Sequence, residues 1–208
     1  MEISICFGES RESLAGGFGF TREGLWRGGV LPGEAAGLLI DDRNPPSVRG
    51  AEAAGRALRD WSGWIVLDLE RPPGPGAERL AQALAGKRTA VPPALAGLPH
   101  GAVLAGPWTG AGSFARWLGA QQDRYGPLVL DALPLRVRGR PGEGWAPWTG
   151  PLPETGYPCP GAGCLQGRLA DGSVLLWDTR ETLAERCRAA GVAAVVFGAD
   201  WEGLGGRS

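Results

Sequence analysis

The sequence predicts an α/β protein built as a compact (β/α)8 TIM-barrel-like fold. About eight short apolar segments recur along the 208 residues, and helix-like segments separate several of them. Strands that alternate with helices predict a parallel sheet, and about eight such units predict that the sheet closes into a barrel. Because 208 residues are few for this fold, we expect some helices to be shortened or replaced by loops. We expect a single domain over residues 1–208.

The expected strands are short runs of aliphatic and β-branched residues bounded by glycine or proline. In chain order they are residues 3–7, 37–40, 64–69, 88–91, 102–105, 127–130, 173–177 and 193–197.

The expected helices have apolar residues at helical spacing, and two of them have clear end signals. They span residues 48–61, 77–84, 114–121 and 179–190. Ser47 is a natural N-cap for the first helix, and Gly191 is a natural stop for the last. Residues 139–165 are rich in Gly, Pro and Trp, and we expect a long irregular loop there.

The composition excludes several classes of protein. The net charge is −1 and hydrophobic residues make up 43%, which argues against a basic nucleic-acid surface and against disorder. No apolar stretch is long enough for a membrane span, and the first residues do not resemble a signal peptide. We therefore expect a cytoplasmic protein with neither a nucleic-acid nor a membrane partner; the oligomeric state is left open.

The cysteine pattern is Cys159-Pro-Gly-Ala-Gly-Cys164, with Cys6 and Cys187 elsewhere. Two free thiols and a disulfide are both compatible with this spacing. A zinc site is disfavoured because the single histidine, His100, and the other cysteines lack ligand spacing. We expect no metal and no cofactor.

The most informative segment is Trp64 to Pro73, where a buried strand ends in two acids. Asp68 and Glu70 are two residues apart and therefore project from the same face of the strand. Ligands bind at the carboxyl ends of parallel strands. The pair is typical of a general acid and a group that tunes it, although a surface-facing strand end paired with Arg71 is the alternative.

Other residues at strand ends are candidates for the same site. Asp41 and Asp42 follow one expected strand and Asp131 follows another, although a turn before Pro45 would also explain the first two. Tryptophans expected in loops or at strand ends can stack on sugars, pack in the core or form a protein interface; they are Trp108, Trp145, Trp148 and Trp201.

The segment from Gly63 to Glu70 resembles the Asp-x-x-Asp-x-Asp-x-Glu motif of glycoside hydrolase family 18, the chitinase-like barrels. The last Asp and the Glu of the motif match Asp68 and Glu70. Three more segments resemble the spore-associated branch of the family, in the same order along the chain. They are Arg71-Pro72-Pro73 with the helix after it, Thr89-Ala-Val-Pro-Pro93 and the strand–helix–strand unit from Asp171 to Phe197, and the resemblance as a whole extends over about half of the chain.

The resemblance implies a substrate-assisted retaining mechanism on N-acetylglucosamine-containing glycans such as chitin or peptidoglycan fragments. Glu70 would be the acid and Asp68 would orient the substrate acetamide. Trp177 and Asp178 match an aromatic-acid pair of the family, although an N-cap at Asp178 or Thr179 explains them equally.

The chain departs from the family at several of these positions. Gly63 and Val66 stand where the family has its two earlier acids, and the segment 102–108 lacks the family's Tyr and Asp. Three functions therefore stay open. The first is a glycosidase, the second is an inactive barrel that binds carbohydrate or protein, and the third is a barrel whose mouth has been reused for other chemistry.

Overall fold

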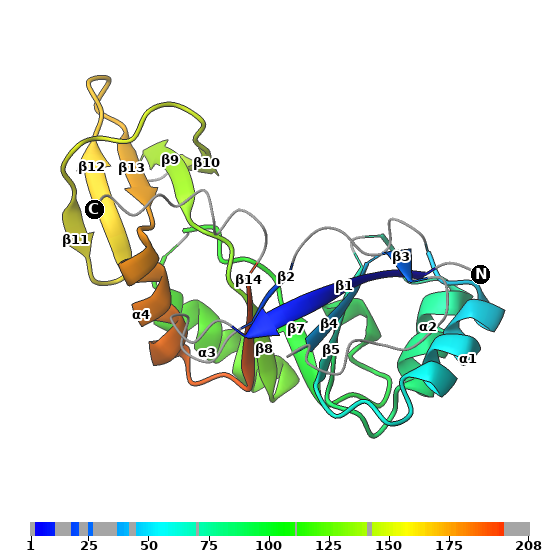
Figure 1. The fold of residues 1–208 in the computed structure, drawn as a ribbon. Helices are drawn as coiled ribbons and strands as arrows, with labels where there is room; N and C mark the ends of the chain where they lie inside the picture. The colour runs from blue at the N-terminus through cyan, green and yellow to red at the C-terminus, as the bar shows by residue number, and fades with distance from the viewer. Residues whose placement is uncertain are drawn as a thin grey trace.

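The structure, a computed structural model, describes residues 3–10, 18–20, 25–26, 37–41, 45–69, 71–110, 112–140 and 143–197. The described elements form two β-sheets and four α-helices. Figure 1 shows the second sheet at one end of the molecule, with α4 between it and the strands of the first sheet.

The first sheet is mostly parallel and has the order β2-β14-β8-β7-β6-β5-β4-β1-β3. Neighbouring strands from β4 through β8 to β14 and β2 are parallel, whereas β1 is antiparallel to β4, β2 and β3. The strands are β1 (Ile3–Ser10), β2 (Phe18–Phe20), β3 (Leu25–Trp26), β4 (Gly37–Asp41), β5 (Trp64–Asp68), β6 (Thr89–Val91), β7 (Ala102–Ala105), β8 (Leu128–Asp131) and β14 (Ala194–Phe197).

The first sheet is strongly curled. Strand β1 pairs with β4 and also with β2, which lies at the far end of the strand order. A flat sheet cannot bring these strands together, so the pairings require it to bend round on itself. The predicted α/β class and its parallel sheet are therefore confirmed, and the sheet is curled. Because β1 runs antiparallel to its neighbours, the described strands do not make the eight parallel strands of a complete (β/α)8 barrel.

Helices cover the outside of this sheet at three crossovers. They are α1 (Val48–Ala57) between β4 and β5, α2 (Pro75–Ala83) between β5 and β6, and α3 (Phe114–Tyr125) between β7 and β8; a short 3-10 helix, η2 (Pro93–Leu95), lies between β6 and β7. Ser47 caps α1 as predicted, since its hydroxyl accepts a hydrogen bond from the Gly50 N–H at 3.1 Å.

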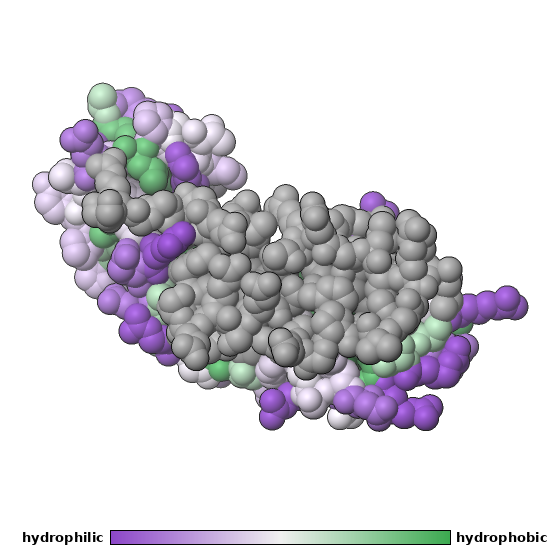
Figure 2. Space-filling view, viewed as in Figure 1, coloured by the Kyte–Doolittle hydropathy of each residue, from purple (hydrophilic) through white to green (hydrophobic). Residues whose placement is uncertain are grey.

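Helices α1 and α2 approach each other closely because glycines lie at the contacts. A Cβ atom at Gly55 would lie 2.7 Å from the Cβ of Ala83, and one at Gly76 would lie 1.6 Å from the carbonyl oxygen of Pro46. The outer sides of both helices are hydrophilic, as Figure 2 shows along the lower right of the molecule.

The two faces of the parallel strands contribute to different apolar clusters. Alternate residues such as Ile65 and Leu67 belong to the large core that includes the helices. The residues between them form a smaller cluster on the other face: Val66, Ala90, Ala102, Leu104 and Val129, with Leu39 and Trp64 packed against it. Period-two alternation therefore separates an outer, helix-covered face from an inner face of the curled sheet.

The second sheet is antiparallel and lies between β8 and α4 (Arg180–Ala190) in the chain. Its order is β10-β9-β13-β12-β11. The strands are β9 (Arg136–Arg140), β10 (Gly144–Pro147), β11 (Tyr157–Cys159), β12 (Cys164–Arg168) and β13 (Val174–Trp177).

This sheet corrects two expectations from the sequence. The prediction of a long irregular loop at 139–165 is wrong, because β10, β11 and parts of β9 and β12 lie there. The run at 173–177 does form a strand, but β13 pairs with β9 and β12 in the second sheet rather than with the parallel strands. Half-exposed antiparallel strands need no continuous apolar run, so their Gly- and Pro-rich sequences carried little strand signal.

Within the described ranges, no helix has both the length and the apolar character needed to cross a membrane.

Candidate functional site

Three aspartates end three strands of the parallel sheet, on its inner face. Asp41, Asp68 and Asp131 are the last residues of β4, β5 and β8. Asp68 lies two residues after Val66, and Asp131 two residues after Val129, both of which belong to the inner cluster. Asp41 lies two residues after Leu39 and is the register partner of Asp68 on the neighbouring strand. Alternation therefore places all three carboxyl groups at the carboxyl end of the inner face.

Two of these carboxyl groups interact electrostatically across the sheet. Burial, and to a smaller extent the negative charge of Asp68, together raise the pKa of Asp131 from 3.8 to about 7. In the strand order, β6 and β7 lie between β5 and β8. The curl of the sheet brings the ends of β5 and β8 near enough for the two charges to repel each other. Asp131 is therefore about half protonated near pH 7, so proton gain and loss both occur in the neutral range beside Asp68.

This arrangement has the chemical properties of an acid–base site. A carboxylic acid with a pKa near 7 can donate a proton at neutral pH and accept it back, which an ordinary aspartate cannot do efficiently. A second carboxylate nearby can orient a polar substrate group or stabilise positive charge. Inner-face burial by Val66, Leu104 and Val129 provides the low-polarity surroundings that such a pair requires.

Three predicted site residues lie outside the described residues: Asp42, Glu70 and Trp201. Asp68 lies on the inner face, which is where the sequence predicted the acid pair to emerge. The role of Glu70 as an acid stays a prediction.

Two of the tryptophans predicted to bind substrate, Trp108 and Trp177, are buried. Trp108 is 7% exposed and contacts Phe114 edge to face, with ring centroids 5.6 Å apart. Trp177 is 4% exposed, and a Cβ atom at Gly156 would lie 2.4 Å from its ring. In this structure both side chains are packed in the interior, so neither offers an open face on which a sugar ring can stack.

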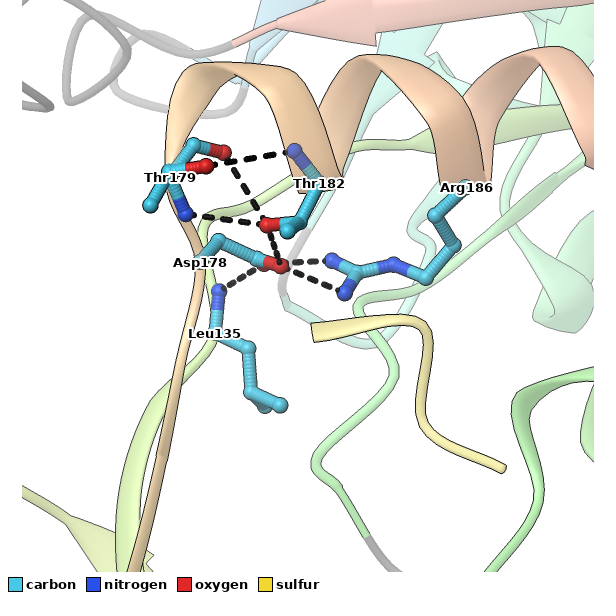
Figure 3. Close-up of polar contacts among 5 residues, drawn as sticks. All are labelled: Leu135, Asp178, Thr179, Thr182 and Arg186. Carbon is cyan, nitrogen blue, oxygen red and sulfur yellow. Dashed lines mark hydrogen bonds and ion pairs between the residues drawn. The ribbon is translucent and has the colours of Figure 1, made fainter. Parts of the chain in front are cut away.

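Asp178 is a buried junction between three segments (Figure 3). Its carboxylate accepts two hydrogen bonds from the Arg186 guanidinium, at 2.7 and 2.6 Å, and one from the Leu135 N–H at 2.7 Å. The Arg186 guanidinium also lies over the rings of Trp108 and Phe114, at 5.6 and 5.5 Å from their centroids. These contacts satisfy the buried charges and indicate a structural role for Asp178.

The N-cap of α4 is Thr179 rather than Asp178. The Thr179 hydroxyl accepts a hydrogen bond from the Thr182 N–H, and the Thr182 hydroxyl accepts one from the Thr179 N–H. Gly191 ends the helix in the left-handed conformation, as predicted. The sequence analysis did not identify Arg186 as the partner of Asp178. The available signal was helical spacing: Arg186 lies four residues after Thr182, on the same face of α4, and both side chains donate to Asp178.

A second hollow, separate from the aspartates, lies on the antiparallel sheet beside β9 and β10. It has a volume of about 590 Å³ and its lining residues are Arg138, Gly139, Arg140, Glu143, Gly144, Trp145, Ala146, Pro147, Trp148, Thr149 and Ser173. The Arg138 guanidinium is held by the Ser173 hydroxyl and the Asp171 carboxylate and lies 5.4 Å from the centroid of the Trp148 ring. We call this hollow the β9–β10 groove.

The described part of the chain contains no group of three or more histidine, cysteine or acidic side chains arranged to hold a metal ion. Comparisons with protein families, with curated proteins and with solved structures find no match to this chain.

Proposed function

We propose that the chain acts on glycans containing N-acetylglucosamine, at the carboxyl end of the inner face of the curled sheet. In this proposal Glu70 protonates the glycosidic oxygen and Asp68 orients the substrate acetamide, whose oxygen attacks the anomeric carbon. Water then hydrolyses the cyclic intermediate. These roles follow from the resemblance of residues 63–70 to family 18 glycosidases, and the first sheet would then be a reduced relative of their (β/α)8 barrel.

The observation that carries the proposal is the shared position of Asp41, Asp68 and Asp131. Three acids at the ends of three strands on one buried face are costly to fold, because like charges repel and burial penalises ionisation. Such clusters concentrate at functional sites. Asp131 adds to the family scheme a carboxyl group that still carries a proton in a substantial fraction of molecules at pH 7. It limits the negative charge beside Asp68 and can donate a hydrogen bond to a sugar hydroxyl.

The direct test is hydrolysis of chitooligosaccharides and of peptidoglycan fragments by the full chain. We expect Glu70→Gln to lower kcat at least about 100-fold, the scale of a lost general acid. Asp68→Asn should lower it as well, because the acetamide loses its orienting partner. Asp60→Asn is the matched control, since Asp60 is exposed and precedes β5 at the opposite end of that strand. Equal turnover by wild type and Glu70→Gln would contradict the proposed mechanism.

A second candidate function is carbohydrate binding without cleavage, and the β9–β10 groove favours it. The groove combines two indole side chains with arginine and glutamate side chains, a composition that can stack on a sugar ring and pair with its hydroxyl groups. Val66 in place of an acid on the inner face also favours an inactive protein. Calorimetric titration with the same oligosaccharides separates the two functions. Binding without turnover, abolished by Trp148→Ala and retained by Asp68→Asn, is the result expected for a binding module.

A further inference from the structure

The hairpin formed by β11 and β12 holds two cysteines directly opposite each other. Cys159 and Cys164 are register partners in this antiparallel pair. Opposed residues in antiparallel strands have Cα atoms about 4.5 or 5.5 Å apart, depending on the type of pair. A disulfide requires a Cα separation of about 4.4–6.8 Å. The backbone therefore already satisfies the first geometric requirement of a disulfide.

The two side chains are also close neighbours. Both cysteines are free thiols, and the Cys159 side chain lies near enough to contribute to the raised pKa of Cys164. Their surroundings differ, because Cys159 is half-buried whereas Cys164 is 3% exposed. Small reagents can therefore reach the Cys159 thiol, whereas the Cys164 thiol on the neighbouring strand is enclosed in the core.

The turn between the two cysteines is tight and well satisfied. The Cys159 carbonyl oxygen accepts hydrogen bonds from the Ala162 and Gly163 N–H groups, at 3.0 and 2.8 Å. Gly163 has φ of 62°, a left-handed conformation that glycine adopts without strain. The turn therefore holds the two strands at their present spacing before any covalent bond forms.

We propose that Cys159 and Cys164 are a thiol pair that small-molecule disulfides such as glutathione disulfide convert into a hairpin disulfide. The Cys159 thiolate attacks one sulfur of glutathione disulfide, forms a mixed disulfide and releases one glutathione thiolate. Cys164 then loses its proton to solvent and attacks the Cys159 sulfur, which releases the second glutathione. The two protein thiols are oxidised by two electrons, and one glutathione disulfide is reduced to two glutathione molecules.

Ring closure is the slow step. The pKa of Cys164 is raised to about 12, chiefly by burial; the negative charge of Asp178 and the neighbouring Cys159 contribute to the rise, and the Arg186 guanidinium opposes it. Because only the thiolate attacks, closure should accelerate about tenfold for each pH unit between pH 7 and pH 9. The reagent-accessible Cys159 is thus the first thiol to react and Cys164 is the resolving thiol.

The disulfide would tighten a contact between the two parts of the molecule. The carbonyl oxygen of the turn residue Gly161 accepts a hydrogen bond of 3.0 Å from the N–H of Phe114, the first residue of α3. Ala162 is buried in the large core. A disulfide across the hairpin would therefore also restrain the start of α3, the helix that follows β7 of the parallel sheet.

The test is oxidation of the full chain with glutathione disulfide, followed by alkylation of the remaining thiols and tryptic peptide mapping. No lysine or arginine lies between residues 141 and 167, so both cysteines stay on one tryptic peptide. We expect this peptide to be two hydrogen atoms lighter and to carry no alkyl group. After reduction it should take up two alkyl groups.

Three variants assign the roles. Cys164→Ser should stop at a glutathione adduct on Cys159, and Cys159→Ser should leave Cys164 open to alkylation. Cys187→Ser is the matched control, because Cys187 is equally buried and lies on α4, outside the hairpin; it should close the ring at the wild-type rate. Pairing of either cysteine with Cys6 or Cys187, a lasting glutathione adduct in the wild type, or full alkylation of both thiols would overturn the proposal. So would a closure rate independent of pH.

Discussion

Burial couples the ionisation of Asp131, at the end of β8, to folding. Its pKa is about 7 in the folded protein, against an ordinary value of 3.8. Between these two values the folded state binds a proton that the unfolded state has lost. The free energy of unfolding should therefore fall as the pH rises from about 4 to about 7, and the loss should be complete above pH 7.

Asp131→Asn should remove this pH dependence, because an amide cannot ionise. We expect the variant to be more stable than the wild type at pH 8 by about 1–3 kcal/mol, below the limit of about 4 kcal/mol that a shift of three pKa units allows. Urea unfolding at pH 5 and pH 8 measures the difference. Asp60→Asn, at an exposed site, should leave the profile unchanged. The variant shows how much of the pH dependence comes from other groups. If the free energy of unfolding of the wild type changed between pH 5 and pH 8 by no more than that of Asp131→Asn, the coupling would be contradicted.

The candidate site was partly predictable from single residues. Asp41, Asp68 and Asp131 follow apolar runs directly, and period-two alternation is a local rule, so the sequence could place them at strand ends on one face. It could not predict that Trp108 and Trp177 are buried. Their burial depends on Phe114 and Gly156, which reach them only through tertiary packing.

Among the helices, the α1–α2 contact has the most demanding requirement for glycine. Gly76→Ala would place a Cβ atom 1.6 Å from the Pro46 carbonyl oxygen, which the backbone can relieve only by moving α2. Alanine is otherwise favourable in a helix by about 1 kcal/mol, so helix propensity and packing act in opposite directions.

We expect packing to prevail and Gly76→Ala to lower the free energy of unfolding by about 1–3 kcal/mol, the usual cost of overpacking. Gly74→Ala is the matched control, because nothing lies within 4 Å of the added Cβ and the residue has an extended backbone that alanine can adopt. Chemical denaturation of both variants checks the prediction. Equal stability of the two would show that α2 is not held against the α1 N-terminus as described.

The elements that the sequence predicted well are those with strong local signals. All four helices occur, and Ser47 and Gly191 mark the predicted ends of α1 and α4. The second sheet was missed because β9, β10 and β11 are short, half-exposed and interrupted by Gly or Pro. Whether such a segment forms a strand depends on the strands that pair with it. A sequence pattern that covers one segment does not reveal partners as distant as Arg136 and Trp177, which are paired in β9 and β13.

At the scale of the whole molecule, the Asp178–Arg186 ion pair connects the antiparallel sheet and α4 to segments that adjoin the parallel sheet. Both side chains are buried, with 0% and 5% of their surfaces exposed. The pair links the start of α4 to the Leu135 backbone before β9 and to the rings of Trp108 and Phe114 after β7. One continuous core also includes Leu67 and Leu130 of the parallel sheet together with Leu176 of the antiparallel sheet. The two sheets should therefore unfold together.

Arg186→Met tests this connection. The substitution leaves the Asp178 carboxylate buried with its hydrogen bonds from Leu135 and Thr182 but without its positive partner, and we expect a loss of about 3–5 kcal/mol in the free energy of unfolding. Adding Asp178→Asn removes the unpaired charge and should restore at least about 1 kcal/mol. Amide hydrogen exchange followed separately in β5 and in β13 provides the decisive measurement, because a shared core requires both strands to lose the same protection in Arg186→Met. Loss confined to β13 would mean that the antiparallel sheet opens on its own, and the ion pair would then stabilise that sheet alone.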